Sequence, residues 1–309
     1  MGSKIAEIMA LNGKDVILSD ISEEILNKGI ASIEQSLAEL VRFHMQKAEK
    51  EIRRLENDFG LKLTEDQIKR IHEHLKPTYD EARKQDAFKR IRLTTSLEEF
   101  ANVDLVIEAI IEVAQVKKEL FNKLDAICDR HAVFATNTSS LSITELGAST
   151  KRASKFLGVH FFNPPTTLPL VEVIPGLETS EETVNDAIDF ISGLRNHRYP
   201  MQPIRVKEVP GFLVNRILGA MLHEAFACYE EGVASMRDID LAMKAGAGMP
   251  MGPFELADMI GIDVLYNVQQ SIKAMEGGNT TPKPIHILRK LYHAGRLGKK
   301  TGRGFYEYA

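Results

Sequence analysis

The chain has 309 residues, of which 44% are hydrophobic and 27% are charged, a length and composition that predict about two globular domains. Its 39 basic and 43 acidic residues give a formal net charge of −4, which argues against nucleic acid as the principal partner. No apolar run approaches about 18 residues, so neither a membrane-spanning helix nor a secretory segment is expected.

The first 90 residues predict one short helix, one strand and a long helical stretch. Residues 4–11 have an apolar helical face that ends at the Asn12-Gly13 turn. Residues 15–20, DVILSD, predict a short buried strand with an acidic residue at its tip. Residues 23–90 are highly charged with helical apolar spacing, and Asp58-Phe59-Gly60 interrupts them, which predicts two antiparallel helices projecting from the domain.

Strands then alternate with helices. Residues 103–110 and 132–137 predict strands on either side of a helix over about 113–128, and two further strands are expected within 158–165 and 168–176. This alternation of strands and helices predicts an α/β fold with a parallel, doubly wound sheet. Ligands of such a sheet bind at the carboxyl ends of the strands. The polar residues expected at those ends are Asp20, Glu108 to Glu112, Asn137 to Ser139, and His160.

The chain after Pro203 predicts helices only, so we expect an α/β domain over 1–205 and an all-helical domain over 206–309. The predicted helices cover 211–232, 236–245, 254–260 and 264–275. Cys128 and Cys228 fall in separate predicted helices without metal-type spacing. Free thiols in a reducing cytoplasm, and no bound metal, are therefore expected.

Two of the predicted strands each carry one polar side chain into apolar surroundings. These are His160, in GVHFFNPP, and Glu172, in LPLVEVIPG. A carboxylate on a strand next to a histidine accepts the Nδ1 proton, fixes the tautomer and stabilises the imidazolium, which makes the histidine a directed base. The alternative, on the local sequence alone, is a histidine that satisfies the turn before Pro164-Pro165.

Asp20 ends the second strand expected of a dinucleotide-binding fold. A carboxylate there receives the adenosine-ribose hydroxyls and repels a 2′-phosphate, which favours NAD over NADP. The alternative is a helix cap before Ile21-Ser22-Glu23-Glu24. The complete G-x-G-x-x-G pattern is absent, and Gly2 matches only its last glycine.

Amide and hydroxyl groups at two further places suit the binding of a cofactor or a substrate oxygen. Asn137-Thr138-Ser139-Ser140 follows a predicted strand, although Ser140 or Ser142 is equally suited to cap the next helix. Asn215 follows the Pro210-Gly211 break at the expected domain junction, where a cleft would make it a substrate contact.

Taken together, the motifs resemble those of the L-3-hydroxyacyl-CoA dehydrogenases, and they follow one another in family order over nearly the whole chain. HFFNP, NTSS and MGPFELAD are the most specific. The other matching stretches are IAEIMALNGKDVILSD, DLVIEAIIE, LVEVI, VPGFLVNRIL and GKKTGRGFYEY.

The resemblance implies an NAD-binding Rossmann-like domain over 1–205 and an all-helical domain over 206–309 that mediates homodimerisation. It implies His160 as general base, Glu172 as the carboxylate that orients it, and Ser139 and Asn215 as donors to the reacting substrate oxygens. It places Gly2, Asp20, Glu112, Lys117, Asn137, Ser139, Asn163 and Lys300 at the cofactor.

The resemblance also implies an acyl-CoA substrate, reversibly oxidised to the 3-ketoacyl-CoA. Ser36, on the projecting helix, matches a position that contacts coenzyme A, together with Ser139 and Asn215 around the acyl group. Arg42 or Lys47 is the candidate for the phosphate of coenzyme A. The composition and the absent apolar run leave no role for nucleic acid or a membrane.

Two other functions fit parts of the pattern. One is a related dehydrogenase that uses the same His–Glu pair on a non-CoA 3-hydroxy acid, and the other is a catalytically silent dimeric scaffold. The charged helical hairpin favours an acyl-CoA, whereas the incomplete glycine pattern is the one feature that supports the scaffold.

The start of the sequence raises a further expectation. Relatives of this kind begin with an apolar strand and a Gly-x-Gly turn before the dipeptide that matches Met1-Gly2. That strand is central in the sheet, and its glycines let backbone amides approach the pyrophosphate. We therefore expect this numbering to represent a shortened start, with a longer native form supplying the strand and loop.

Overall fold

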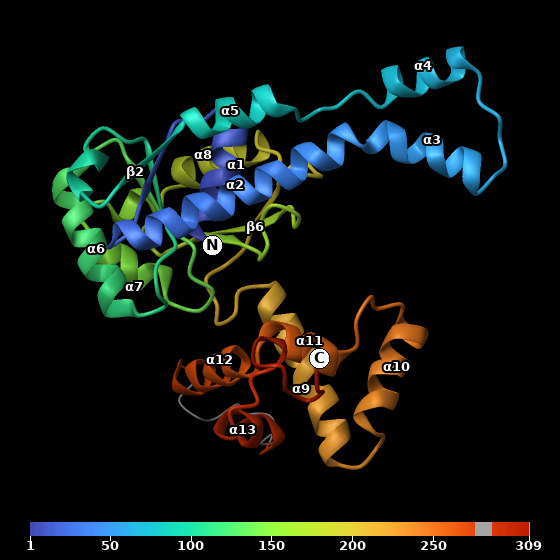
Figure 1. The fold of residues 1–309 in the computed structure, drawn as a ribbon. Coiled ribbons are helices and arrows are strands. Elements are labelled where there is room, and N and C mark those ends of the chain that lie inside the picture. Colours follow the sequence, from blue (N-terminus) through green and yellow to red (C-terminus); the bar gives the residue numbers. More distant parts are fainter. Residues whose placement is uncertain (276–285, 309) are drawn as a thin grey trace. The chain divides into compact units, whose positions relative to one another are not determined.

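A computed structural model describes residues 1–275 and 286–308, and it divides into two compact units. The first unit contains 1–138 and 142–205, and the second contains 139–141 and 206–309. The first is an α/β unit and the second is helical (Figure 1), which confirms the predicted fold class. In the described part of the chain no helix is long and apolar enough to cross a membrane.

The strands of the first unit form two separate sheets. Strands β1 (Val16–Ser19) and β2 (Ile91–Thr94) make a parallel pair. The larger sheet has the order β3-β4-β5-β6-β7. Its strands are β3 (Leu105–Glu108), β4 (Val133–Thr136), β5 (Phe156–Phe161), β6 (Leu170–Pro175) and β7 (Gln202–Arg205).

This arrangement differs from the single parallel sheet that the sequence predicts. β5 and β6 are antiparallel, whereas β3, β4 and β5 are parallel to one another. The reason is the length of the connection, since residues 162–169 are too few for the crossover of about a dozen residues that a parallel neighbour requires. β2 and β7 were also not predicted from the sequence. β7 lies at the edge of its sheet, where a strand tolerates a proline such as Pro203.

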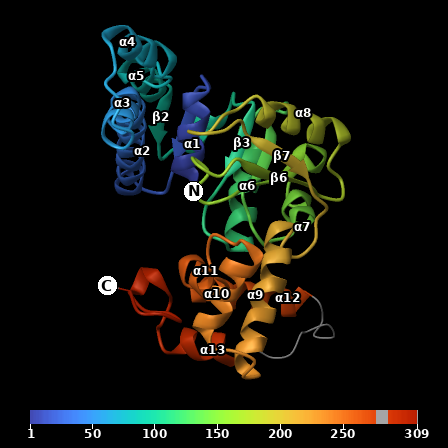
Figure 2. The same cartoon turned by 90° about the vertical axis from the view of Figure 1, so that its right-hand side faces the viewer.

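Helix α1 (Gly2–Leu11) occupies the place predicted for the first helix, and Gly13 forms the following turn with φ +75°. Its apolar face supplies Ile5 and Met9 to a core that contains residues from β5 and β6. α8 (Glu181–Ser192) packs against β5, β6 and β7 (Figure 2). The remaining helices of the sheet region are α6 (Ala114–Ile127) and α7 (Ile143–Ala148).

The predicted two-helix hairpin is made of four helices. They are α2 (Glu23–Met45), α3 (Lys47–Asn57), α4 (Glu65–His74) and α5 (Glu81–Lys89). α3 and α4 lie side by side (Figure 1). The chain turns between them at the predicted break, where Gly60 adopts φ +65°. Ile33, Leu37 and Leu40 of α2 are buried, as their helical spacing predicts, and they share a core with Ala6 and Ala10 of α1.

The second unit contains α9 (Val214–Glu230), α10 (Met236–Ala247), α11 (Pro253–Ile260), α12 (Ile262–Met275) and α13 (His286–His293). Its apolar core includes Phe226, Phe254 and Phe305, whose rings contact one another. α13 is the one described helix of this unit that the sequence analysis did not predict. Lys299–Thr301 forms a short 3-10 helix.

Two buried carboxylates explain the MGPFELAD and GKKTGRGFYEY motifs as structural elements. Asp258 accepts the backbone N–H groups of Phe305 and Tyr306 at 2.8 and 2.9 Å, and Asp240 accepts that of Phe254 at 2.8 Å. A Cβ on Gly304 would lie 1.9 Å from Oδ1 of Asp258. The glycine is therefore required by the close approach of the C-terminal segment to α11.

Candidate active site

The site centres on His160 and Glu172, which face each other across the β5–β6 pair. Nδ1 of His160 lies 2.8 Å from Oε2 of Glu172. The Glu172 side chain is fully buried and that of His160 is 8% exposed. A buried carboxylate in contact with Nδ1 fixes the orientation of the imidazole and directs Nε2 away from the carboxylate.

The local sequence explains why these two strands meet at these residues. β5 is buried along its whole length, and Val159 and Phe161 on either side of His160 point into the apolar core. Val171 and Val173 flank Glu172 in the same way. Because side chains alternate between the two faces of a sheet, both polar residues project to the face opposite this core, where they pair with each other.

Asn137 holds the end of β5. Its Oδ1 accepts the backbone N–H of Phe161 at 2.9 Å, and its own N–H donates to the carbonyl of Glu108 at 2.8 Å. Ser142 caps α7 through the backbone N–H of Glu145, at 3.0 Å. Of the two serines considered for that cap, Ser142 is therefore the one that serves it.

A buried lysine lies beside the carboxyl end of β3. Lys117, whose side chain is 1% exposed, donates to Glu108 at 2.6 Å and pairs with Glu112 at 3.1 Å. Glu108 also accepts Thr136 Oγ1 at 2.6 Å, and Glu112 accepts the hydroxyl of Thr138. Lys117 and Glu112, both predicted near the cofactor, are thus joined in one network in which each carboxylate has several donors.

Asp20 and Gly2 line one groove of the first unit. Asp20 is exposed directly after β1, and the α2 cap is Ser22, which accepts the backbone N–H of Ile25 at 3.3 Å. This excludes the alternative of Asp20 as the helix cap. An exposed carboxylate and the first turn of α1 supply acceptors for hydroxyl groups and N–H donors for phosphate, so the residues present fit a dinucleotide.

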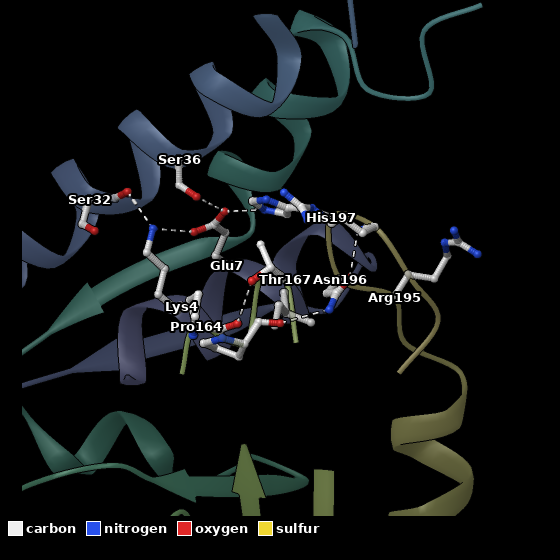
Figure 3. Close-up of polar contacts among 12 residues, drawn as sticks. Lys4, Glu7, Ser32, Ser36, Pro164, Thr167, Arg195, Asn196 and His197 are labelled. Carbon is white, nitrogen blue, oxygen red and sulfur yellow. Dashed lines mark hydrogen bonds and ion pairs between the residues drawn. The ribbon is translucent and has the colours of Figure 1, made fainter. Parts of the chain in front are cut away.

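Ser36 contributes to a polar cluster that the sequence analysis missed (Figure 3). Glu7, fully buried in α1, accepts Ser36 Oγ at 2.7 Å and Lys4 Nζ at 3.1 Å, and lies 2.7 Å from Nε2 of His197. Lys4 also donates to the carbonyl of Ser32 at 3.0 Å. An acidic residue on the apolar face of residues 4–11 was the available signal for this buried carboxylate, but its partners come from distant segments.

The other predicted residues are spread over both units. Asn163 is exposed after β5 and precedes a cis peptide bond to Pro164. Lys300 donates to both carboxylate oxygens of Asp263, at 2.5 and 2.6 Å, within the second unit. Ser139 and Asn215 also belong to the second unit. Their positions at the substrate or cofactor, and that of Lys300, stay predictions.

Comparison with known proteins identifies relatives along the whole chain. The NAD-binding domain of 3-hydroxyacyl-CoA dehydrogenase matches residues 1–209, and the C-terminal domain of 3-hydroxyacyl-CoA dehydrogenase matches residues 211–308. The chain is 39% identical over 308 residues to the mitochondrial hydroxyacyl-coenzyme A dehydrogenase of Homo sapiens, covering 100% of this chain and 88% of the human one.

A bacterial relative and a solved structure agree with this assignment. A 3-hydroxybutyryl-CoA dehydrogenase of Clostridioides difficile is 37% identical, with 100% of this chain and 96% of that one covered. The crystal structure of (S)-3-hydroxybutyryl-CoA dehydrogenase PaaH1 from Ralstonia eutropha superposes with a TM-score of 0.83 at 38% identity. That superposition covers 100% of this chain and 95% of the other.

Proposed function

The chain belongs to the 3-hydroxyacyl-CoA dehydrogenase family, and we propose that its His160–Glu172 pair is the general base of an NAD-dependent oxidation of 3-hydroxyacyl-CoA to 3-ketoacyl-CoA. The observation that carries this proposal is the buried 2.8 Å contact between the two side chains. Burial strengthens the contact, because a neighbouring carboxylate stabilises an imidazolium more strongly at low dielectric than in water.

The chemistry requires a base at the 3-hydroxyl group. An alcohol is a poor hydride donor until its proton is being removed, so Nε2 of His160 accepts that proton as the carbon is oxidised. Glu172 holds Nδ1 protonated and offsets the positive charge that forms on the ring. In the reverse direction the imidazolium returns the proton to the 3-keto oxygen. Ser139 and Asn215 are proposed to donate hydrogen bonds to the reacting oxygens.

NAD, when bound, supplies the hydride acceptor. Asp20 would hold the adenosine ribose, and the first turn of α1 at Gly2 would face the phosphates. Glu112, Lys117, Asn137, Asn163 and Lys300 are proposed near the rest of the cofactor. Support for part of this assignment comes from Asn137, which bonds the strand that carries His160, and from Lys117, which Glu108 and Glu112 hold in place.

Ser36 is proposed to contact the coenzyme A portion of the substrate. Its hydroxyl donates to Glu7, so an oxygen lone pair of Ser36 is the group offered to a ligand N–H or O–H. Arg42 and Lys47, further along the same helical arm, remain the candidates for the phosphate. The acyl-CoA is favoured over a non-CoA hydroxy acid by this arm and by the relatives, which are a hydroxyacyl-coenzyme A dehydrogenase and a 3-hydroxybutyryl-CoA dehydrogenase.

A homodimer formed through the helical unit is also proposed. Large apolar side chains of this unit are exposed on α9, α10 and α11, namely Ile217 at 64%, Leu241 at 59% and Met259 at 52%. A contiguous apolar patch marks an association surface, and these three side chains are proposed to contribute to one. Sedimentation velocity should give a dimer for the intact chain, and Ile217→Asp should shift it to a monomer without loss of helicity.

The activity is tested by following NADH oxidation with acetoacetyl-CoA, and separately with free acetoacetate. Turnover with the thioester alone supports the proposal. Turnover with the free acid at comparable kcat/KM would favour the non-CoA dehydrogenase, and no turnover with either, in a protein that binds NADH, would favour the scaffold.

A further inference from the structure

Glu7 is a buried carboxylate of α1 that the proposed proton transfer does not use. Its side chain is fully buried, and both of its oxygens are in contact with partners. Oε1 accepts the Ser36 hydroxyl at 2.7 Å and lies 2.7 Å from Nε2 of His197, whereas Oε2 pairs with Nζ of Lys4 at 3.1 Å (Figure 3). A buried charge is stable only where it is paired and hydrogen-bonded, so these three partners account for its presence in the interior.

The turn that carries His197 is anchored independently of this contact. The backbone N–H of His197 donates to the carbonyl of Thr166 at 3.0 Å. Asn12 of α1 exchanges two hydrogen bonds with the backbone of Arg195, at 2.8 and 3.0 Å. The buried Asn196 accepts two backbone N–H groups of the turn, at 2.9 and 2.8 Å. The imidazole is therefore held in place beside the carboxylate by the main chain on both sides of it.

Glu7 decides the polarity of Ser36. A serine hydroxyl has one proton and two lone pairs, so by itself it can either donate to a ligand or accept from one. An ionised carboxylate accepts only, and it takes the proton of Ser36. Ser36 is half-buried, so its remaining lone pairs are within reach of a ligand. A phosphate oxygen is disfavoured there, both by these lone pairs and by the negative charge behind them.

We propose that Glu7 is a positioning residue for the substrate, which fixes Ser36 as a hydrogen-bond acceptor for an N–H or O–H group of the coenzyme A arm. This role rests on the proposed contact of Ser36 with that arm. The donors available are the pantetheine amides and the amino and hydroxyl groups of the adenosine. The arm does not change during the reaction, so the contact stabilises substrate and transition state equally. Glu7 therefore acts on KM and not on kcat.

The test is the kinetics of acetoacetyl-CoA reduction by Glu7→Gln, which keeps the shape of the side chain. The ammonium of Lys4 attracts the amide oxygen, so the amide N–H turns to Ser36 and reverses the polarity of its hydroxyl. His197 tolerates the change, because a neutral imidazole accepts at Nε2 in one tautomer. KM should rise by about fivefold, which corresponds to the loss of one hydrogen bond, while kcat stays within about twofold of wild type.

Two shorter substrates locate the effect. For S-ethyl thioacetoacetate, which lacks the coenzyme A arm, the ratio of kcat/KM between Glu7→Gln and wild type should be close to one. Acetoacetyl-pantetheine keeps the amides and lacks the adenosine. A raised KM for this thioester identifies an amide N–H as the donor, and an unchanged KM identifies the nucleotide.

A rescue and a control distinguish this role from a structural one. Lys4→Met in the Glu7→Gln chain removes the charge that orients the amide, so the amide oxygen can turn to Ser36 and KM should return to within about twofold of wild type. Ser36→Ala should raise KM by about fivefold, and adding Glu7→Gln should not raise it further. Glu34→Met, at an exposed glutamate of α2, removes the same charge and should leave KM nearly unchanged.

Circular dichroism checks the folding of every variant. If Glu7→Gln is unfolded, Glu7→Met replaces it and should raise KM by about two- to threefold, an effect that should vanish in the Ser36→Ala background. The role of Glu7 is overturned if KM for acetoacetyl-CoA is unchanged, if turnover of the ethyl thioester falls equally, or if the effects of the Glu7 and Ser36 variants multiply. Failure of the wild type to reduce acetoacetyl-CoA would instead overturn the proposed function.

Discussion

Glu172 lies directly opposite His160 in the antiparallel register of β5 and β6, 2.8 Å from its Nδ1. A shift of register by one residue would turn Val171 or Val173 to the histidine and move the carboxylate to the core face. The five cross-strand pairs of β5 and β6, from Leu157–Pro175 to Phe161–Val171, therefore fix the geometry of the pair. The apolar residues on the core face stabilise that register.

His160→Gln should lower kcat for acetoacetyl-CoA reduction by about 10²-fold or more while leaving NADH binding nearly unchanged, because it removes the proton donor and little else. Glu172→Gln should also lower kcat, since an amide does not offset the imidazolium charge. His131→Gln is the control, because His131 is an exposed histidine of the same unit. Wild-type turnover by His160→Gln would exclude the pair from the mechanism.

Asp20→Ala should weaken the binding of NAD and reduce the preference for NAD over NADP by about tenfold. The reason is that an acceptor for the ribose and a charge that repels a 2′-phosphate are lost together. Asp15→Ala, at the other end of β1, is the control and should alter neither Michaelis constant. The measurement is KM for both cofactors at fixed substrate. Equal constants in wild type and Asp20→Ala would contradict a ribose contact.

Gly304→Ala should destabilise the helical unit by about 2–4 kcal/mol, because the new methyl group would lie 1.9 Å from Oδ1 of the buried Asp258. Gly219→Ala is the contrasting control. Gly219 lies within α9 with nothing within 4 Å of an added Cβ, so this change should stabilise by about 0.5–1 kcal/mol. Urea unfolding measures both, and equal stabilities would contradict the close packing at Gly304.

Lys300→Met should reduce stability most near neutral pH. Burial opposes ionisation of Asp263, but hydrogen bonds and charge from Lys300 outweigh it and hold the pKa of Asp263 below its usual value of 3.8. A lowered folded-state pKa stabilises the protein above the unfolded value, and this contribution is lost as the pH falls through the folded value.

The stability difference between wild type and Lys300→Met should therefore be constant from pH 7 to about 5 and shrink below about pH 4. Lys207→Met, at an exposed lysine of the same unit, should show no such dependence. Urea unfolding across this pH range is the measurement. A difference that stays constant down to pH 2 would assign the effect to packing of the lysine stem instead.

The amino-acid sequence by itself predicted most of the elements and identified His160 and Glu172 as the candidate pair. Apolar periodicity is a local property, so it placed α1, β1, β3 to β6 and the helices α9 to α12 close to their observed bounds. The family motifs added the dehydrogenase assignment. Short elements without a strong period, such as β2 and β7, were missed because their conformation depends on a neighbouring strand rather than on their own residues.

Tertiary structure alone decided which distant groups meet. The contact of the buried Glu7 with His197 at 2.7 Å and the close approach of Gly304 to Asp258 join segments that no local pattern connects. The physical reason is that a buried charge or a close backbone approach is tolerated only where its partner is brought to it. Such partners are selected by packing of the whole unit, not by the residues on either side in the sequence.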